Sequence, residues 1–270
     1  MKMNIVVCIK QVPGSTEIQI NSTTNTLIRE GVEAIINPFD LYAIEEGLRL
    51  KEQYDGNVTV LSMGPPHVES ALREALSYGV DEAVMVTDRA FAGADTLATA
   101  VTLAAAIQHI GEPDIVLMGR QAIDGDTGQV GPSTAEKLGV AHITEVKKIE
   151  AISDGVANIQ RMLEDGYARI SVNLPLLITV VKEINEPRPA SFKGKLRAKK
   201  AEIRRLCLQD LGLTSESVGL TGSPTRVMKI FSPPKPTGGK VFNGDTQTAV
   251  AALINELQEA GLVLKQPSGD

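Results

Sequence analysis

Residues 115–131 read IVLMGRQAIDGDTGQVG, a short apolar run followed by a glycine-rich loop. The run at 115–119 has the length and composition of a buried strand, and residues from about 129 to 138 have the spacing of an amphipathic helix. A strand, a loop and a helix in succession form the unit from which helix-covered parallel sheets are built. This stretch therefore predicts an α/β fold, provided that the unit recurs.

The unit does recur on the N-terminal side of this stretch. Asn37 before Pro38 marks one helix start, because Asn is a favoured side-chain cap and Pro a favoured first helical residue. The other predicted strands are residues 4–9, 58–62 and 83–86, and the predicted helices start at 38 or span 67–77 and 94–109. We therefore predict a Rossmann-like parallel sheet with flanking helices.

Three parts of the chain depart from this alternation. A hairpin is predicted from strands at 16–20 and 26–28, and an antiparallel set from strands at 156–161, 167–172 and 176–181. The last part is rich in Gly and Pro and holds one amphipathic helix at about 246–260. The expected organisation is a nucleotide-binding α/β domain at 1–205, with a basic loop at 185–205, and an extended C-terminal arm at 206–270 that wraps a partner.

Composition excludes several classes of function. The 270 residues carry a net charge of −6 and only five Phe, four Tyr and no Trp, which argues against a nucleic-acid surface. Two Cys and three isolated His offer no metal-ligand spacing, so no metal site is expected. No apolar run approaches the ~18–20 residues of a membrane span, so we expect a soluble, cytoplasmic protein without membrane insertion.

The loop after 115–119 is the main candidate binding site. In an open parallel sheet, ligands bind at the carboxyl ends of the strands. Gly119, Gly125, Gly128 and Gly131 permit close approach of the backbone, and the loop leads into a helix N-terminus that favours phosphate. The spacing fits neither the dinucleotide fingerprint nor the phosphate loop of NTPases. The alternative is a tight surface turn with solvated aspartates.

The segment Asp95-Thr96-Leu97-Ala98-Thr99 is the second candidate. Asp95 could simply cap a helix, whereas Thr96 and Thr99 would share one face and could reach a cofactor. Cys8 lies in an apolar strand and is expected to be an inert thiol, and Met63 a packing residue that could touch a ligand. With no catalytic constellation evident, a bound cofactor is expected to perform the chemistry.

The chain resembles the beta subunit of electron-transfer flavoprotein over nearly its whole length. The resemblance is carried by VCIKQVP at 7–13, NPFD at 37–40, GRQAID at 119–124 and NEPR at 185–188, and by a family signature over 159–179. One departure is Ala168, where the pattern usually has Glu or Gln. The implied fold is that of the adenine-nucleotide alpha-hydrolase-like proteins.

The resemblance implies a heterodimer with an alpha subunit that carries FAD. Ordinary beta subunits hold a structural AMP, whereas residues 94–100 resemble electron-bifurcating members, in which FAD takes that place and NADH is the electron donor. Electrons would then pass to ferredoxin or flavodoxin and to an acyl-CoA dehydrogenase. The implied cofactor-binding residues are Cys8, Asn37, Phe39, Asp40, Met63, Asp95, Thr96, Thr99, Arg120, Gln121, Asp124, Gly125, Asp126, Thr127, Gly128, Gln129, Val130 and Gly131.

The basic stretch gains a meaning from the same resemblance. Residues 188–205 hold eight basic residues against one acid, a local charge of +7. In the family this stretch docks the dehydrogenase through one apolar side chain, a position that Phe192 occupies. The implied docking residues are Phe192, Arg188, Lys193, Lys195 and Arg197. The alternative is a solvated loop whose Phe192 packs back on the domain.

Three hypotheses remain open at this point. The first is a bifurcating beta subunit with FAD, and the second is an ordinary beta subunit with AMP. The third, from the fold alone, is an adenine-nucleotide sensor of the stress-protein type, against which the Pro-rich tail and the basic stretch argue.

Overall fold

The computed structural model describes residues 2–14, 33–229, 231 and 238–262, and the backbone of residues 19–21 and 26–28. The chain divides into two compact units, Met1–Lys229 and Ile230–Asp270. The expected domain boundary lay at residue 205, earlier in the chain. The difference arises because residues after 205 pack on the sheet, where Leu206 and Val218 are fully buried.

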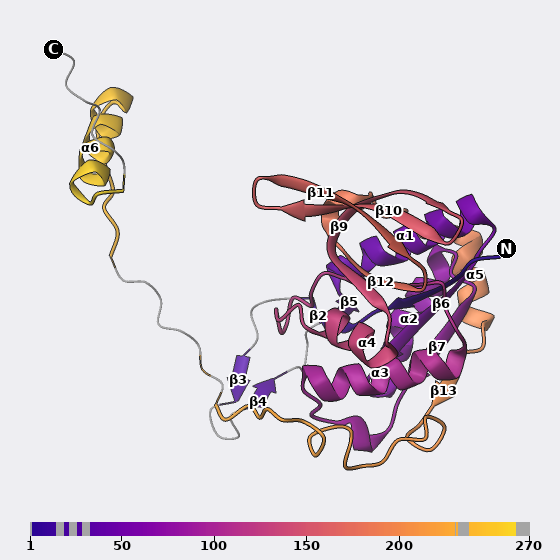
Figure 1. Ribbon diagram of the computed structural model, residues 1–270. Helices are drawn as coiled ribbons and strands as arrows, with labels where there is room; N and C mark the ends of the chain where they lie inside the picture. The colour runs from indigo at the N-terminus through magenta and orange to yellow at the C-terminus, as the bar shows by residue number, and fades with distance from the viewer. Residues whose placement is uncertain are drawn as a thin grey trace. The chain divides into compact units, whose positions relative to one another are not determined.

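The first unit is built on a sheet of nine strands in the order β11-β10-β9-β12-β8-β1-β6-β7-β13 (Figure 1). Seven of them run parallel, and β10 and β11 run antiparallel to their neighbours. The strands are β1 (Asn4–Cys8), β6 (Asn57–Met63), β7 (Glu82–Val86), β8 (Ile115–Gly119), β9 (Ala141–Ser153), β10 (Val156–Leu163), β11 (Gly166–Asn173), β12 (Leu176–Val180) and β13 (Arg204–Leu206). The predicted α/β class is confirmed.

Helices cover both faces of this sheet, because successive side chains of a strand point to opposite faces. In β1, Ile5 and Val7 pack with the helices of one face, whereas Val6 and Cys8 pack with those of the other. The first face is covered by α1 (Pro38–Tyr54), α2 (Glu69–Tyr78) and α5 (Phe192–Lys200), and the second by α3 (Thr96–Ile110) and α4 (Val130–Leu138). Strands buried on both faces explain the continuous apolar runs in the sequence.

Two small antiparallel pairs accompany the main sheet. β2 (Gln11–Pro13) pairs with β5 (Ala34–Ile36), and β3 (Gln19–Asn21) pairs with β4 (Thr26–Ile28). The second pair confirms the predicted hairpin, except for residues 16–18 and the turn at 22–25, which lie outside the described residues. In the second unit, α6 (Thr246–Glu259) occupies the predicted C-terminal helix.

The assignment of residues 176–181 to the antiparallel set was wrong. β12 lies between β8 and β9 and is parallel to both. All five of its residues are buried, which is typical of a central strand and not of an edge. The third antiparallel strand is β9, which the sequence did not indicate.

The basic stretch is also not the loop that was expected. Residues 192–200 form α5, whose start is fixed by Ser191, since its hydroxyl accepts from the N–H of Gly194 at 2.9 Å. Within the described residues, the structure contains no helix long and apolar enough to cross a membrane.

Candidate functional site

The strand order places a switch point at β1. The chain runs from β1 to β6 and β7 on one side and then returns to β8 on the other. The crevice outside the carboxyl ends of strands at such a point is the usual ligand site of open α/β sheets. The segments that follow β1 and β8, and the starts of α1, α3 and α4, therefore form the candidate site (Figure 1).

Asp40, in the first turn of α1, joins the ends of β1 and β8. One carboxylate oxygen accepts from the backbone N–H of Lys10 at 2.7 Å, and the other from that of Gly119 at 3.1 Å. Burial raises the pKa of this carboxyl to about 7, outweighing the opposite effect of these backbone donors. Asp40 thus braces the edge of the sheet, and both of its oxygens are committed to the backbone.

Asn37 stands at the N-cap position of α1, but its side chain does not cap the helix, so that expectation was wrong. Its amide instead donates to the carbonyl of Gln121 at 2.8 Å and accepts from the N–H of Ile123 at 3.1 Å. The first turn has little need of a cap, because Pro38 has no N–H and the N–H of Asp40 bonds to the Asn37 carbonyl at 2.8 Å. Asn37 therefore holds the loop after β8.

The four glycines of that loop have different roles. A side chain at Gly119 would overlap Asp40 and Phe39, and one at Gly131 would overlap Thr179, so these two are needed for packing. Gly125 faces open space, with no atom within 4 Å of a Cβ placed there, and Gly128 adopts a left-handed φ of 62°. The part of the loop open to a ligand is thus residues 125–128.

The charged groups of the loop are largely paired. Lys10 forms an ion pair with Asp124 at 2.6 Å, so Asp124 is not merely solvated. Arg120 donates to the Gln121 side chain at 2.9 Å and lies 3.8 Å from Glu145. The amide of Gln121 in turn bonds to Asp126. These pairs fix the loop but reduce the free positive charge, so an anion here would depend on backbone N–H groups.

The N-termini of α3 and α4 differ in how they are capped. The Asp95 carboxylate accepts from the N–H groups of Leu97 and Ala98, each at 3.0 Å, which agrees with the capping alternative. The residue before α4, Gln129, makes no side-chain cap. Uncapped N–H groups at a helix start favour an anion, so α4 provides the more favourable of the two ends.

Thr96 connects these two helix starts. Its hydroxyl bonds to the Gln129 side chain at 3.0 Å, and Thr99, one turn further along α3, is half-buried. Thr96, Gln129 and the adjoining Val130 are thereby brought to the same place. Thr127 lies beside them, at 3.5 Å from the N–H of Gln129.

Cys8, Met63 and Phe39 complete the predicted set. Cys8 is buried, and burial raises the pKa of its thiol well above the ordinary range, so the thiol stays protonated and unreactive. Met63 packs against the apolar cluster beneath α3 and α4, and half-buried Phe39 closes over Gly119. These residues shape the floor of the site.

The basic segment forms a second feature, on α5. Phe192 is 80% exposed and does not pack back on the domain. Lys193 and Lys195 are also exposed, whereas Arg197 reaches inward and donates to the carbonyls of Leu76 and Val80 at 2.8 and 2.6 Å. Arg197 therefore attaches α5 to the end of α2.

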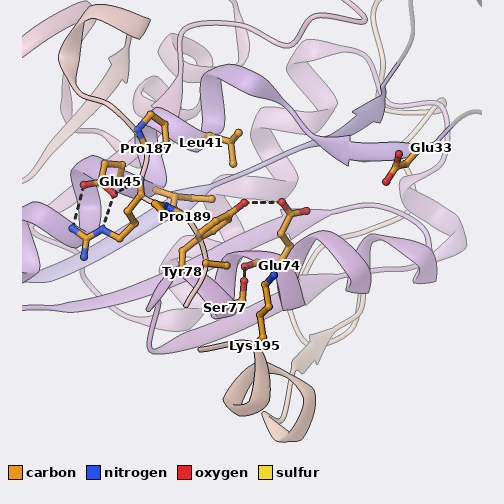
Figure 2. A pocket seen from close by; sticks show the side chains of 12 residues that line it. Glu33, Leu41, Glu45, Glu74, Ser77, Tyr78, Pro187, Pro189 and Lys195 are labelled. Carbon is orange, nitrogen blue, oxygen red and sulfur yellow. Dashed lines mark hydrogen bonds and ion pairs between the residues drawn. The ribbon is translucent and has the colours of Figure 1, made fainter. Parts of the chain in front are cut away.

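Arg188 likewise serves to anchor the segment. Its guanidinium bonds to Glu45 at 2.7 Å and to Glu52 at 2.5 Å. Figure 2 shows Glu45 at the wall of a groove of about 610 Å³ between α1, α2 and residues 187–195, where Tyr78 bonds to Glu74 at 2.7 Å. Because these polar groups pair with one another, the groove adds no free charge to the docking segment.

Sequence reasoning missed several residues of the site. Lys10, Glu145 and Thr179 hold the loop after β8 through the pairs described above and through a bond from the N–H of Glu145 to the Thr179 hydroxyl at 3.2 Å. Lys10 directly follows a predicted strand and could have been included on that signal. Glu145 and Thr179 carried no comparable signal, since both lie in strands whose order was not predicted.

The fold and this edge define an α/β protein of the doubly wound class, which binds its ligands at a switch point. The described residues contain no group of three or more His, Cys, Asp or Glu side chains that could hold a metal ion. The class alone leaves the ligand open.

Comparison with known proteins narrows the class. The family "Electron transfer flavoprotein domain" matches residues 24–211. An "Electron transfer flavoprotein subunit beta" of Thermoanaerobacterium thermosaccharolyticum is 49% identical over 97% of this chain and 100% of its own. The "Caffeyl-CoA reductase-Etf complex subunit CarD" of Acetobacterium woodii is 46% identical over 97% and 100%, and "Protein FixA" of Azorhizobium caulinodans is 47% identical over 94% of each chain.

The chain therefore belongs to the electron transfer flavoprotein family, as a beta subunit. It is a component of electron transfer that acts with an alpha subunit.

Proposed function

We propose that this beta subunit binds FAD at the edge formed by the loop after β8 and the starts of α3 and α4. Together with its alpha subunit it takes electrons from NADH and divides them between a low-potential acceptor, ferredoxin or flavodoxin, and an acyl-CoA dehydrogenase. These partners place its action in the cytoplasm. The alternative is an ordinary beta subunit that holds AMP at the same edge.

The observation that carries the proposal is the uncapped start of α4 beside an open stretch of glycine loop. The N-terminal N–H groups of α4 have no side-chain cap, and residues 125–128 leave the backbone accessible. Both features suit a phosphate group, which FAD and AMP share. Binding would therefore rest on backbone donors, in keeping with the few aromatic residues of the chain.

FAD is favoured over AMP by what lies next to this phosphate position. Thr96 and Thr99 stand on one turn of α3, and Thr96 is bonded to Gln129 at 3.0 Å. Their hydroxyls extend the polar surface beyond what a mononucleotide needs, so they would contact the ribityl chain or flavin. The relatives support this, since CarD is named as a subunit of a caffeyl-CoA reductase-Etf complex.

Each part of the chain has its own task in this proposal. FAD, when bound, supplies the acceptance of two electrons from NADH and their release one at a time. Residues 125–131 and Thr96 orient it, Asp40 and Asn37 keep the loop in place, and buried Cys8 and Met63 exclude water from the floor. The exposed ring of Phe192 on α5 docks the dehydrogenase, and α6 contributes to binding the alpha subunit.

An anaerobic titration of the purified heterodimer with NADH tests the proposal. A bifurcating subunit predicts that NADH alone bleaches the flavin absorbance of two flavins. A heterodimer in which NADH bleaches no flavin, or in which only one flavin is present, would rule out bifurcation.

A further inference from the structure

Asp95 makes more contacts than a helix cap needs. One carboxylate oxygen serves α3, through Leu97 and Ala98. The other accepts from both the N–H of Thr225 at 3.0 Å and the Thr225 hydroxyl at 2.8 Å. One side chain therefore binds the first turn of α3 to a segment 130 positions later in the sequence.

The segment around Thr225 is held by further bonds to the same place. The N–H of Asp95 donates to the Ser223 hydroxyl at 2.8 Å, and that hydroxyl donates to the carbonyl of Gly219 at 2.7 Å. The N–H of Leu220 donates to the carbonyl of Ala92 at 2.9 Å. We call residues 219–226 and their bonds to residues 92–95 the clasp.

Backbone geometry indicates that the clasp is a built feature. Gly219 has a left-handed φ of 55°, and a Cβ there would overlap the carbonyl of Ala90. Gly93, on the other side of the contact, has a φ of 73°. Two glycines in a conformation that other residues rarely adopt allow the two backbones to approach closely.

The clasp lies between two functional parts of the chain. On one side, Asp95 adjoins Thr96, which bonds to Gln129 at the proposed cofactor edge. On the other side, the clasp lies just before Lys229, where the first unit ends and the chain continues into the unit that holds α6. Whatever orders the first turn of α3 also keeps the Asp95 carboxylate aligned with Thr225.

We propose that the clasp couples the cofactor edge to the C-terminal arm, with Asp95 as a positioning residue and not a cofactor ligand. A cofactor that orders Thr96 and Gln129 holds Asp95 in place, and Asp95 then fixes the segment from which the arm departs. Because such coupling is reciprocal, binding of the alpha subunit by the arm strengthens retention of the cofactor. This inference rests on the proposed function for the position of the cofactor, but it holds for FAD and for AMP alike.

Hydrogen exchange of the heterodimer, stripped of nucleotide and then supplied with FAD or with AMP, tests the coupling. In the wild type, the nucleotide that binds slows amide exchange of residues 219–226, roughly fivefold or more. Thr225→Val removes the hydroxyl from the Asp95 carboxylate but leaves the α3 cap intact, and it is expected to abolish most of this slowing. It also weakens nucleotide binding several-fold, although Thr225 is not among the predicted ligands.

Thr221→Val is the matched control. Thr221 belongs to the same segment, and its hydroxyl makes no hydrogen bond within the described part of the chain, so this variant should behave as wild type. Unchanged exchange of residues 219–226 on nucleotide binding, or a Thr225→Val variant that responds like wild type, would overturn the coupling. Binding of AMP but not FAD would instead overturn only the proposed bifurcation, since the exchange response is expected with either.

Discussion

At the scale of single residues, the site depends on side chains that hold backbone rather than ligand. Asp40, Asn37 and Asp95 were all predicted to surround the cofactor, and each bonds to backbone N–H or carbonyl groups instead. The sequence correctly drew attention to them because polar groups at strand ends and helix starts are uncommon in a core. It could not show their partners, since Asn37 bonds to residues more than 80 positions away.

Asp40 gives the structure a pH dependence. Its pKa is raised from 3.8 to about 7 by burial, so the folded state keeps a proton that the unfolded state releases. The resulting stability is fully present below pH 3.8 and is lost as the pH rises toward about 7, by up to about 4 kcal/mol. Urea unfolding at pH 5 and pH 8 measures this loss.

Asp40→Asn is the informative variant for that measurement. Its side chain is neutral at both pH values, so the difference in unfolding free energy between pH 5 and pH 8 should shrink relative to wild type. An equal difference in the variant would show that other groups cause the pH dependence.

Gly128 and Gly125 form a matched pair in the open part of the loop. Gly128→Ala forces an alanine into a left-handed conformation, at a cost of about 1–2 kcal/mol, and should weaken nucleotide binding about tenfold. Gly125→Ala has free space and no positive φ, so its backbone should keep the same path. Equilibrium titration of stripped protein with FAD compares them, and equal affinities would contradict the assigned role of the loop conformation.

At the scale of elements, the helices were predicted well and the strand order was not. Helix starts carry local signals, such as Pro38 in α1 and Asp95 before α3, which one sequence reveals. The place of β12 between β8 and β9 depends on pairing between distant segments, which periodicity does not encode. β9 escaped prediction because its pairing is irregular: its register shifts against β10 and β12, and Glu145 within it has a φ of 57°.

The docking element illustrates how position and exposure are set separately. Gly194 lies so close to the carbonyl of Ser77 that a side chain there would overlap it, and Arg197 binds the end of α2. These contacts fix α5 while its first residue, Phe192, remains exposed. An exposed aromatic among cations suits a small, transient electron-transfer contact.

Phe192→Ala should therefore weaken coupling to the dehydrogenase about tenfold without changing flavin content or stability. The rate of partner-dependent flavin oxidation at limiting dehydrogenase measures this effect. Tyr167→Ala removes another exposed aromatic, on β11, and serves as control. If the two variants lose coupling equally, or if Phe192→Ala loses none, α5 is not the docking element.

At the scale of the whole molecule, two compact units divide the work. The first carries the sheet, the cofactor edge, the clasp and α5, and the second carries α6. Exposed apolar residues of α6, among them Val250, Leu253 and Ile254, fit a helix that binds another subunit. The net charge of −6 thus conceals a local concentration of positive charge at 188–205, and the family membership gives that contrast a purpose.

The central claim is that FAD occupies the edge of this subunit. Its most direct test is a count of the cofactors released from the purified heterodimer by denaturation, with FAD and AMP separated by chromatography. The account predicts two FAD and no stoichiometric AMP per heterodimer. One FAD together with one AMP would contradict it and identify an ordinary beta subunit.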